Sequence, residues 1–468
     1  MISILDKINE YLWSYILVAL LIICALYFTF RSRGVQFRLF GRMCRLLFGG
    51  GDKDDDKDTE KKKISSFRAF SVSLASRVGT GNMAGVASAI VVGGPGAVFW
   101  MWMIALFGAA TSFVESTLAQ VYKRRGKDSF IGGPAYYMKH GLGKGWLGVV
   151  FAVLITLTFG ISYNMLQSNT ICAAMENAFD VPPVVSGIFL AILTFVIIFG
   201  GIHRISGISQ IIVPIMALGY LLLAIVVIGM NITKIPDIFA LIFRSAFGWE
   251  QAVGGGIGAA VMQGFKRGLF SNEAGEGSAP NAAATADIDH PASQGLVQAL
   301  GVFVDTLVVC SCTAFIILAS GAPLDGTLDG INLTQAALQN EVGGGAVIYV
   351  TLAIFFFAFS SVLGNTYYGE TNIRFFSQKK LPMVIYRLSV CAIVLLGAFV
   401  SLDTAWVFVD IMMALLTLCN LAAIIPLSKI SFKVLDDYCS QLKKGIESPV
   451  FHKNILSEKE RKGISEWE

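Results

Sequence analysis

Charge is scarce in this chain. Of its 468 residues, 15% are Asp, Glu, Lys or Arg, whereas 55% are hydrophobic, and the mean hydropathy is +0.67. A water-soluble protein of this length would need far more charge to cover its surface. The net charge of +4 gives no reason to expect a nucleic-acid partner, because the basic residues lie between apolar runs.

Histidine and paired cysteine are scarce as well. The four histidines are scattered and the eight cysteines are dispersed, with only Cys310 and Cys312 close together. A C-x-C pair alone is a weak indication of a metal site, and most of the cysteines lie inside apolar runs as small hydrophobes. The sequence also contains no nucleophile–base–acid constellation and no phosphate-binding loop. We therefore expect neither an enzyme nor a protein with a His/Cys metal site.

The chain does contain many apolar runs of about 20 residues, long enough to cross the roughly 30 Å hydrocarbon core as helices. The first run, 11–30, is followed by RSRGVQFR and no A-x-A cleavage site, so we interpret it as a retained helix. A further run begins near 250 and is broken by glycines. The others lie near 86–110, 147–162, 184–202, 208–230, 296–320, 346–364, 383–402 and 405–428. This pattern predicts an all-α polytopic membrane protein, since the segments of a β-barrel would alternate over about 10 residues.

The charge of the loops predicts the orientation. Segment 31–68 holds eleven Lys and Arg and segment 123–144 holds six, whereas 176–183 and 321–342 hold none. By the positive-inside rule the first two segments are cytoplasmic. One leading helix and ten further spans satisfy every loop, with the N-terminus outside the cell and the C-terminus in the cytoplasm. We therefore expect a multi-pass protein of the cell membrane, with the lipid bilayer as its surroundings.

The ten later spans divide into two sets of five. Because five is odd, the second set enters the membrane from the opposite side, which is the inverted-repeat arrangement of many secondary transporters. Segment 431–446 is interpreted as an amphipathic stretch that packs peripherally at the membrane surface. The expected organisation is a leading helix over 1–30, a charged cytoplasmic loop over 31–67, five-helix repeats over 68–246 and 247–428, and a cytoplasmic tail over 429–468.

Glycine gathers at the start of both sets, in RVGTGNMAG (77–85) and in GGGIGAAVMQGFKRGLFSNEAGEGSAP (254–280). Each glycine costs roughly 1 kcal/mol relative to Ala in a helix interior. Paired breaks at corresponding positions indicate a binding site, because unwound backbone in a membrane is tolerated where it lines a cavity. Amides of a resumed half-helix attract a carboxylate, and carbonyls that end the preceding half attract a cation. The alternative is close helix packing through the Gly81-x-x-x-Gly85 spacing.

Five stretches, in order, resemble the alanine or glycine:cation symporter family. They are GTGNMAGVASAIVVGGPGAVFWMW (79–102), GGPAYYM (132–138), GFKRGLFSNEAGEGSAPNAAA (264–284), HPASQG (290–295) and DTLVVCSCTA (305–314). The resemblance extends from about 66 to 428. It implies a leucine-transporter-like 5+5 inverted repeat with one extra N-terminal transmembrane helix, about 11 spans in all. It also implies sodium-coupled import of a small neutral amino acid, alanine or glycine, by alternating access.

The resemblance further implies substrate-binding residues. The break of the first core helix meets the substrate carboxylate, the break of the sixth closes the pocket, and the third and eighth core helices add polar side chains. Asn365 stands where related alanine carriers are expected to have Trp, which would widen the pocket toward a larger polar substrate such as glutamine; serine is another candidate. The implied set is Thr80, Gly81, Asn82, Gln167, Phe270, Ser271, Asn272, Ser361 and Asn365.

For sodium, the resemblance implies a site between the first and eighth core helices. Its ligands would be the carbonyls of Ala75, Val78 and Phe357 and the hydroxyls of Ser360 and Ser361. Five neutral oxygens suit a monovalent cation, since a divalent ion more often recruits Asp or Glu. The alternative for the two serines is a hydrogen bond back to a carbonyl of their own helix.

Two other functions stay open at this point. A proton-coupled carrier would use Glu273 or Asp305 as the titrating group, because ionisable residues in a span are functional candidates. A structural role is the alternative for Glu273 and Glu276, either accepting backbone N–H bonds of the break or pairing with Arg267 or Arg77. A channel or receptor is disfavoured by the asymmetric glycine breaks and by the lack of an appended sensor domain.

Overall fold

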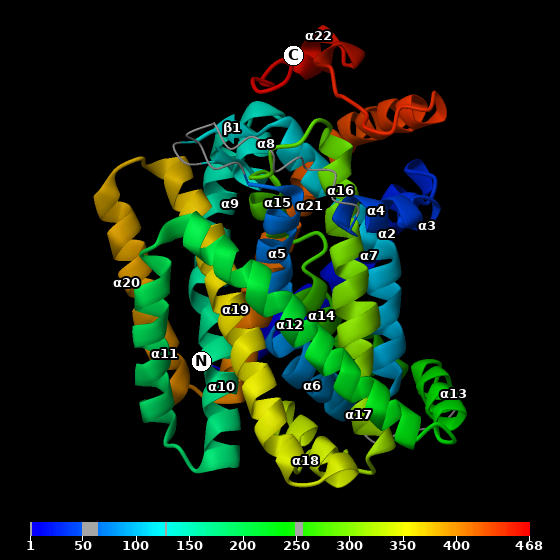
Figure 1. Ribbon diagram of the computed structural model, residues 1–468, viewed down its shortest axis with the longest axis vertical. Helices are drawn as coiled ribbons and strands as arrows, with labels where there is room; N and C mark the ends of the chain where they lie inside the picture. The colour runs from blue at the N-terminus through cyan, green and yellow to red at the C-terminus, as the bar shows by residue number, and fades with distance from the viewer. Residues whose placement is uncertain (1, 49–63, 127–128, 249–255) are drawn as a thin grey trace.

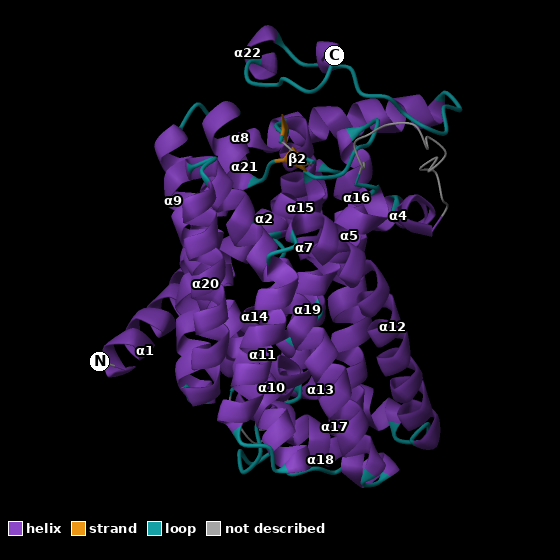
Figure 2. Ribbon diagram, turned by 60° about the vertical axis from the view of Figure 1, so that its left-hand side comes forward, coloured by secondary structure: helices purple, strands orange, loops and turns teal. Residues whose placement is uncertain are grey.

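The computed structural model describes residues 2–48, 64–126, 129–248 and 256–468. Nearly all of this chain is helical (Figures 1 and 2), as the sequence predicts. A short antiparallel hairpin, β1 (Arg124–Arg125) with β2 (Phe130–Ile131), lies among the helix ends at one end of the bundle. The all-α fold class is therefore confirmed.

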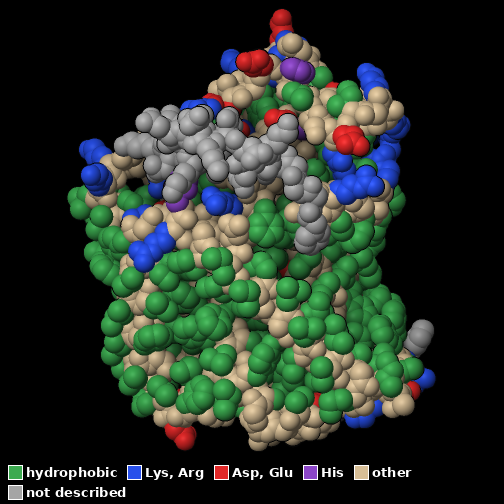
Figure 3. Space-filling model, in the orientation of Figure 1, with side chains coloured by type: hydrophobic (Ala, Val, Ile, Leu, Met, Phe, Trp, Pro, Cys, Tyr) green, Lys and Arg blue, Asp and Glu red, His purple; other side chains and the backbone are tan. Residues whose placement is uncertain are grey.

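Among the described residues, eight helices are long and apolar enough to cross a membrane. They are Lys7–Arg31, Gly96–Val121, Gly145–Phe179, Gly201–Met230, Pro291–Ala319, Gly345–Phe376, Lys380–Phe399 and Leu402–Lys443. Two shorter apolar helices span Gly81–Gly93 and Pro183–Ile198. Figure 3 shows hydrophobic side chains covering the middle of the molecule, with most of the visible Lys and Arg above them. The chain is a multi-pass membrane protein.

The leading span is a continuous rod that begins away from the bundle. In Figure 2 its first segment projects sideways from the other helices. The rod consists of α1 (Ile2–Tyr11), the π-helical turn η1 (Leu12–Leu17) and α2 (Val18–Arg31). Two short helices follow, α3 (Val35–Arg38) and α4 (Phe40–Phe48).

The first predicted set of five contains one broken helix and several whole ones. Its elements are α5 (Ser66–Arg77), η2 (Gly81–Gly85), α6 (Val86–Gly93), α7 (Gly96–Val121), α8 (Pro134–His140), α9 (Gly145–Leu157), η3 (Thr158–Tyr163), α10 (Asn164–Phe179), α11 (Pro183–Ile198), α12 (Gly201–Met230) and α13 (Ile235–Ala246). The apolar run 86–110 divides at a turn between α6 and α7, where Gly94 has φ +73°. Gly96 then packs so closely on the end of α13 that a Cβ would lie 2.4 Å from the Ala246 nitrogen. GGPGAVFW therefore forms a hairpin between two helices.

The second predicted set begins beyond the undescribed residues 249–255. Its elements are α14 (Ile257–Asn272), α15 (Ala279–Ala283), α16 (Pro291–Val302), η4 (Phe303–Cys310), α17 (Ser311–Ala319), α18 (Gly330–Val342), α19 (Gly345–Phe376), α20 (Lys380–Leu396), η5 (Gly397–Phe399) and α21 (Leu402–Lys443). Helix α21 continues through 428, where we expected the span to end and the tail to begin. It contains Pro426, and its last part runs across one end of the bundle (Figure 1), so 431–443 is an extension of this helix. A proline inside a helix is a common cause of such a bend.

Both predicted helix breaks exist, but each is displaced along the chain by a few residues. The first break consists of Val78 and Gly79, so Thr80, Gly81 and Asn82 already belong to the resumed helix. The second break runs over 273–278, so Phe270, Ser271 and Asn272 form the last turn of α14. Helix α14 ends there because the next residues leave the right-handed region, with φ values of +56° at Glu273 and +99° at Gly275.

Candidate functional site

The start of the resumed first helix lies against the last turn of α14. A Cβ on Gly81 would lie 3.0 Å from Cδ1 of Phe270 and 3.1 Å from Cα of Ser271. Only glycine permits this approach without displacing one of the helices. One residue further on, the Asn82 Nδ2 donates a hydrogen bond to Ser271 Oγ at 3.1 Å. Gly81, at the start of the resumed helix, therefore serves the contact with the last turn of α14.

Two amide side chains hold the first break in place. The Gly79 N–H donates to Asn82 Oδ1 at 2.8 Å, and the Thr80 N–H donates to Gln167 Oε1 at 2.9 Å. The first amides of a helix have no partner within the helix, so they are available to an acceptor oxygen. The hydroxyl Oγ1 of Thr80 is buried and has no hydrogen-bond partner among the described residues. The start of the resumed helix thus presents one amide to an oxygen acceptor and one hydroxyl that is free to bind a ligand.

The five predicted sodium ligands converge. Ser361 Oγ lies 2.9 Å from the Ala75 carbonyl, 3.3 Å from that of Val78 and 3.1 Å from that of Phe357. Ser360 Oγ lies 2.9 Å from the Phe357 carbonyl and 3.4 Å from that of Ala75. Both hydroxyls therefore form the back-bond to their own helix, and both also reach the end of α5. The oxygens of α5 are available because the helix stops at this point and its last carbonyls lack helical partners. A monovalent cation fits such a set of neutral oxygens.

We call the oxygens of the five predicted sodium ligands the cation cluster. This cluster and the candidate substrate residues meet at Gly79. A Cβ on Gly79 would lie 2.2 Å from Ser361 Oγ and 2.9 Å from Gln167 Oε1. One backbone position therefore touches a predicted sodium ligand and a predicted substrate residue. The sites are adjacent, and α10, α19 and the end of α5 all contribute to this point.

Two residues of the predicted substrate set point elsewhere. Asn272 donates from Nδ2 to Thr306 Oγ1 at 3.2 Å, which directs it toward η4. Asn365 donates to Asn164 Oδ1 at 3.1 Å and accepts from Ser76 Oγ at 2.6 Å. Asn365 lies one turn along α19 from Ser361, so it belongs to the neighbouring polar layer between α5 and α10.

An aromatic wall borders the same region. The ring of Phe270 lies 4.7 Å from that of Tyr163 and 5.0 Å from that of Trp406. A Cβ on Gly85 would lie 3.6 Å from Cη2 of Trp406, so this indole faces the resumed helix. Sequence reasoning missed Tyr163 and Trp406. Aromatic residues inside apolar spans carry no signal that separates them from ordinary core residues.

Asp305 adds a carboxylate next to the candidate site. It accepts hydrogen bonds from Asn82 Nδ2 at 2.7 Å, Ser271 Oγ at 2.7 Å and Thr306 Oγ1 at 2.9 Å, and its side chain is fully buried. This carboxylate therefore positions two of the predicted substrate residues. Among the described residues, no group of three His, Cys, Asp or Glu side chains is arranged to hold a metal ion.

The carboxylate that braces the second break is one that the sequence did not single out for this role. Glu115 of α7 accepts the N–H groups of Gly275 and Gly277 at 3.2 and 3.1 Å. We had expected Glu273 and Glu276 to accept such bonds, but they bind hydroxyl groups instead. Sequence reasoning missed Glu115 because it lies about 160 residues before the backbone that it holds.

Glu273 and Glu276 lie between the breaks and the aromatic wall. Glu273 accepts from Ser76 Oγ at 2.6 Å and from Ser278 Oγ at 2.5 Å. Glu276 accepts the Tyr163 hydroxyl with both oxygens at 3.0 Å. Both side chains are buried, so they link the broken segment to α5 and η3.

The expected arginine partners bind other groups. Arg267 forms an ion pair with Asp410 of α21 at 2.9 Å. Arg77 donates to the Gln298 carbonyl at 3.0 Å and to Ser112 Oγ at 3.1 Å. Their guanidinium groups therefore fasten α14 to α21 and α5 to α7 and α16.

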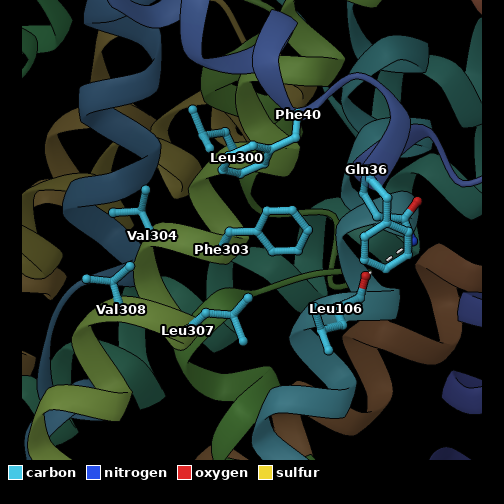
Figure 4. A pocket seen from close by; sticks show the side chains of 9 residues that line it. Gln36, Phe40, Leu106, Leu300, Phe303, Val304, Leu307 and Val308 are labelled. Atoms are coloured by element: carbon cyan, nitrogen blue, oxygen red, sulfur yellow. Dashed lines mark hydrogen bonds between the residues drawn. The ribbon is translucent and has the colours of Figure 1, made fainter.

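A separate apolar cavity of about 430 Å³ lies outside this region (Figure 4). Residues of α3, α4, α7, α16 and η4 line it, including Phe40, Leu106, Leu300 and Phe303, and Gln36 supplies its polar group. A zwitterionic amino acid needs partners for both charges. None of the predicted site residues lines this cavity, so we do not assign it to the substrate.

Solved structures support the fold. The chain superimposes on a manganese transporter of Eremococcus coleocola with a TM-score of 0.51 over 86% of each chain, at 13% sequence identity. At this identity the likeness concerns the fold alone.

Sequence comparisons extend over nearly the whole chain. The chain is 51% identical to the amino-acid carrier protein AlsT of Bacillus subtilis, over 97% of this chain and 95% of that protein. It is 49% identical to the probable sodium/glutamine symporter GlnT of the same bacterium, over 98% and 94%. It is 40% identical to the sodium/alanine symporter AgcS of Methanococcus maripaludis, over 91% and 95%. The family model described as the sodium:alanine symporter family matches residues 1–453. The chain belongs to the sodium:alanine symporter family.

Proposed function

We propose that this protein is a sodium-coupled symporter that imports a small neutral amino acid by alternating access. Alanine and glycine are the first candidate substrates, with glutamine and serine next. The observation that carries the proposal is the junction at Gly79, where the neutral oxygens around Ser361 adjoin the Gln167 and Thr80 groups. Transport, rather than catalysis, is also the function of the named relatives.

In the proposed substrate site, the α-carboxylate binds at the start of the resumed helix. The Thr80 amide and the unpartnered Thr80 hydroxyl would donate to it, and the positive end of the helix dipole would favour its charge. In the structure, Gln167 accepts the hydrogen bond of this amide, so the substrate carboxylate would replace Gln167 as the acceptor. Phe270 and Trp406 would pack against a short side chain.

In the proposed cation site, the carbonyls of Ala75, Val78 and Phe357 and the hydroxyls of Ser360 and Ser361 bind sodium. The buried serine hydroxyls would turn from donating to these carbonyls to offering their own oxygen to the ion. The protein supplies neutral oxygens and excludes water, which suits a weakly held monovalent ion.

Glutamine is a candidate because of the polar layer beside the site and because of one relative. Asn365, Asn164 and Ser76 offer hydrogen-bonding groups one turn from Ser361. The relative GlnT is named as a probable sodium/glutamine symporter. The longer polar side chain of a bound glutamine would form hydrogen bonds with these groups, in place of those that they form with one another.

We also propose the inverted repeat and the orientation. The two broken helices and α11, counted with the eight long helices, give about 11 spans. The broken helices begin the predicted repeats 68–246 and 247–428, and they contact each other beside their breaks, where Asn82 donates to Ser271. Under this proposal 31–67 and 429–468 are cytoplasmic and the N-terminus of the leading helix is outside.

Reconstituted protein tests the function directly. We expect labelled alanine to accumulate in proteoliposomes under an inward sodium gradient, with less uptake when choline replaces sodium. Competition by unlabelled glycine, serine and glutamine would rank the substrates. Uptake that follows an imposed proton gradient in the absence of sodium would overturn sodium coupling.

A proton-coupled carrier is the second candidate, and one observation favours it. Four fully or almost fully buried carboxylates lie around the breaks, and the nearby buried arginine, Arg77, balances one negative charge. Bare buried charges are costly, so these carboxylates are candidates for proton transfer. The four are Glu115, Glu273, Glu276 and Asp305. Two relatives, in Bacillus subtilis and Bacillus sp. strain PS3, carry sodium/proton-dependent alanine carrier in their names.

A further inference from the structure

The residues after α21 fold back over one end of the bundle instead of extending away from it (Figures 1 and 2). We call residues 446–468 the C-terminal strap. It contains the short helices η6 (Lys453–Ile455) and α22 (Glu458–Arg461). Phe451, Leu456 and Trp467 are only 2%, 1% and 8% exposed. Apolar side chains so well buried in a polar segment indicate a docked structure rather than a solvated tail.

The strap is closed on itself. The Lys453 N–H donates to the Glu468 carbonyl at 2.7 Å, which joins its two ends. Ser457 and Glu460 form a capping box at the start of α22. These two contacts give the strap a shape of its own, so it can dock and detach as a unit. Outside the strap, Lys433 of α21 forms an ion pair with Glu460 at 2.7 Å and so fastens α22 to α21.

The strap docks on the end of α7 and on α8. The Trp467 Nε1 donates to the Gln120 carbonyl at 2.9 Å, and the Lys123 ammonium lies 4.4 Å from the centre of the Trp467 ring. Arg124 donates to the Gly463 carbonyl at 2.6 Å. Gly463 has φ +95°, and a Cβ there would lie 2.2 Å from the His140 carbonyl oxygen. The docking therefore depends on a glycine at this position.

Gln120 of α7 and Lys123, two residues after its end, also hold the backbone around the end of α15, in the second broken helix. Gln120 Nε2 donates to the carbonyls of Ala283 and Ala286 at 2.5 and 3.1 Å. Lys123 Nζ donates to the Ala286 carbonyl at 3.2 Å. These acceptors terminate α15, which directly follows the break. The docking surface of the strap and the end of α15 thus share two residues.

The strap also contacts the loop that links α15 to α16. The Phe451 N–H donates to the Asp289 carbonyl at 3.0 Å. Two residues earlier, the Asp287 N–H donates to the Ile64 carbonyl at 3.0 Å, just before α5 begins. Both half-helices on this side of the candidate site, α5 and α15, are therefore tied to the backbone that the strap holds.

We propose that the C-terminal strap is an autoinhibitory latch that keeps the cytoplasmic side of the transporter closed. The proposal rests on the proposed function, in which α5 and α15 separate to release the amino acid and sodium inward. While the strap is docked, the end of α15 and the start of α5 are held together. Detachment of the strap frees them, so the docked protein transports more slowly than the undocked one.

Two glycines provide a matched pair of variants. Gly463 and Gly445 both have positive φ, +95° and +81°, so alanine strains the backbone at either position. Nothing lies within 4 Å of a Cβ at Gly445, whereas at Gly463 the Cβ meets backbone of α8. Gly463→Ala therefore dislodges the strap, and Gly445→Ala controls for strain alone. Trp467→Ala is a second way to undock it.

Hydrogen–deuterium exchange in nanodiscs tests the latch without relying on transport. We expect Gly463→Ala and Trp467→Ala to speed exchange over 64–70 and 279–287 by roughly fivefold or more, the lower end of coupling between distant sites. Gly445→Ala and the distant helix α18 should keep wild-type exchange. Unchanged exchange over both segments in both undocked variants would overturn the latch.

Uptake measurements separate the latch from the proposed function. With an inward sodium gradient, both undocked variants should take up labelled alanine faster than wild type. Equal or slower uptake by both variants, in protein that is folded by size-exclusion chromatography, would refute autoinhibition. Wild type that fails to transport alanine would refute the substrate assignment, while the exchange experiment would still decide whether the strap holds α5 and α15.

Discussion

The sodium site makes the sharpest prediction, because two adjacent serines contribute unequally. Ser361 Oγ reaches three carbonyl oxygens, including that of Val78 at the break itself. Ser360 Oγ reaches two, and its distance to Ala75 is the longer, at 3.4 Å. We therefore expect Ser361→Ala to weaken sodium binding more than Ser360→Ala, with the double variant weakest.

The magnitude follows from the chemistry of a lost ligand. Removing one buried polar partner and leaving the others unsatisfied costs roughly 1–3 kcal/mol. At about 1.4 kcal/mol for each tenfold change, Ser361→Ala should raise the half-saturating sodium concentration on the order of tenfold. Ser361 is fully buried, so water is not available to replace the hydroxyl.

The assay is the initial rate of labelled alanine uptake into proteoliposomes against sodium concentration, at constant ionic strength with choline. Thr371→Val is the control on the same helix, because the Thr371 hydroxyl is buried and bonds back to the Tyr367 carbonyl of α19 at 3.2 Å. It should leave the sodium dependence unchanged. A double variant of Ser360 and Ser361 with the sodium dependence of wild type would refute the assigned site.

Three further predictions concern the start of the resumed helix, the polar layer and the loop before α16. Gly81→Val should abolish alanine binding to purified protein while preserving membrane insertion, because even a Cβ at this position would lie 3.0 Å from the nearest ring carbon. Gly85→Ala should lose at most a few-fold in alanine affinity, because its Cβ would lie 3.6 Å from the nearest atom. Normal alanine binding by Gly81→Val would refute the assigned pocket. Asn365→Leu should remove competition by glutamine and retain alanine uptake, because leucine has a similar volume but lacks the two hydrogen-bonding groups of the amide. Glutamine competition that persists in this variant would show that Asn365 does not contact the substrate. Burial lowers the pKa of His290 below its usual value of about 6.5, so the folded state favours the neutral ring that accepts the Ala292 N–H. The resulting stability is present above about pH 6.5 and is lost as the pH falls toward the lowered pKa, so melting curves from pH 8 to 5 should show a steeper loss in wild type than in His290→Asn.

The five residues predicted as sodium ligands lie together, whereas two of the predicted substrate residues point elsewhere, and this difference has a physical reason. Carbonyls at a helix end and hydroxyls on one face of the facing helix are fixed by backbone geometry, and all five predicted residues converge. Side chains that bind substrate depend on rotamers and on distant partners. Asn272 and Asn365 therefore turn toward Thr306 and Asn164.

The breaks were found but displaced for a related reason. Glycine shows that a helix can unwind, whereas caps decide where it does. Asn82 accepts the Gly79 amide and so ends the first break early. The bracing of Gly275 and Gly277 by Glu115 connects segments about 160 residues apart, which no local pattern reports.

The C-terminal strap is the part that sequence reasoning described least well. Its composition is that of a solvated tail, with charged residues throughout and few apolar ones. Those few, among them Phe451 and Trp467, are the buried anchors, and their partners lie on α7 and in the loop before α16. Sparse anchors on a polar segment give no periodic signal, so the docking appears only in the folded chain.

The continuity of the chain at the first break gives the proposed coupling its physical basis. Val78 offers its carbonyl to the cation cluster, Gly79 lies against Ser361 and Gln167, and Thr80 offers its amide. The Val78 carbonyl and the Gly79 N–H belong to one planar peptide unit, and only the φ and ψ angles of Gly79 separate that unit from the Thr80 amide. Under the proposed function, a cation that orders the Val78 carbonyl therefore restricts the conformations open to the Thr80 amide. Each ligand then lowers the conformational cost of binding the other, which is positive cooperativity, and by linkage the effect is reciprocal. Coupling of this kind needs no direct contact between sodium and the amino acid.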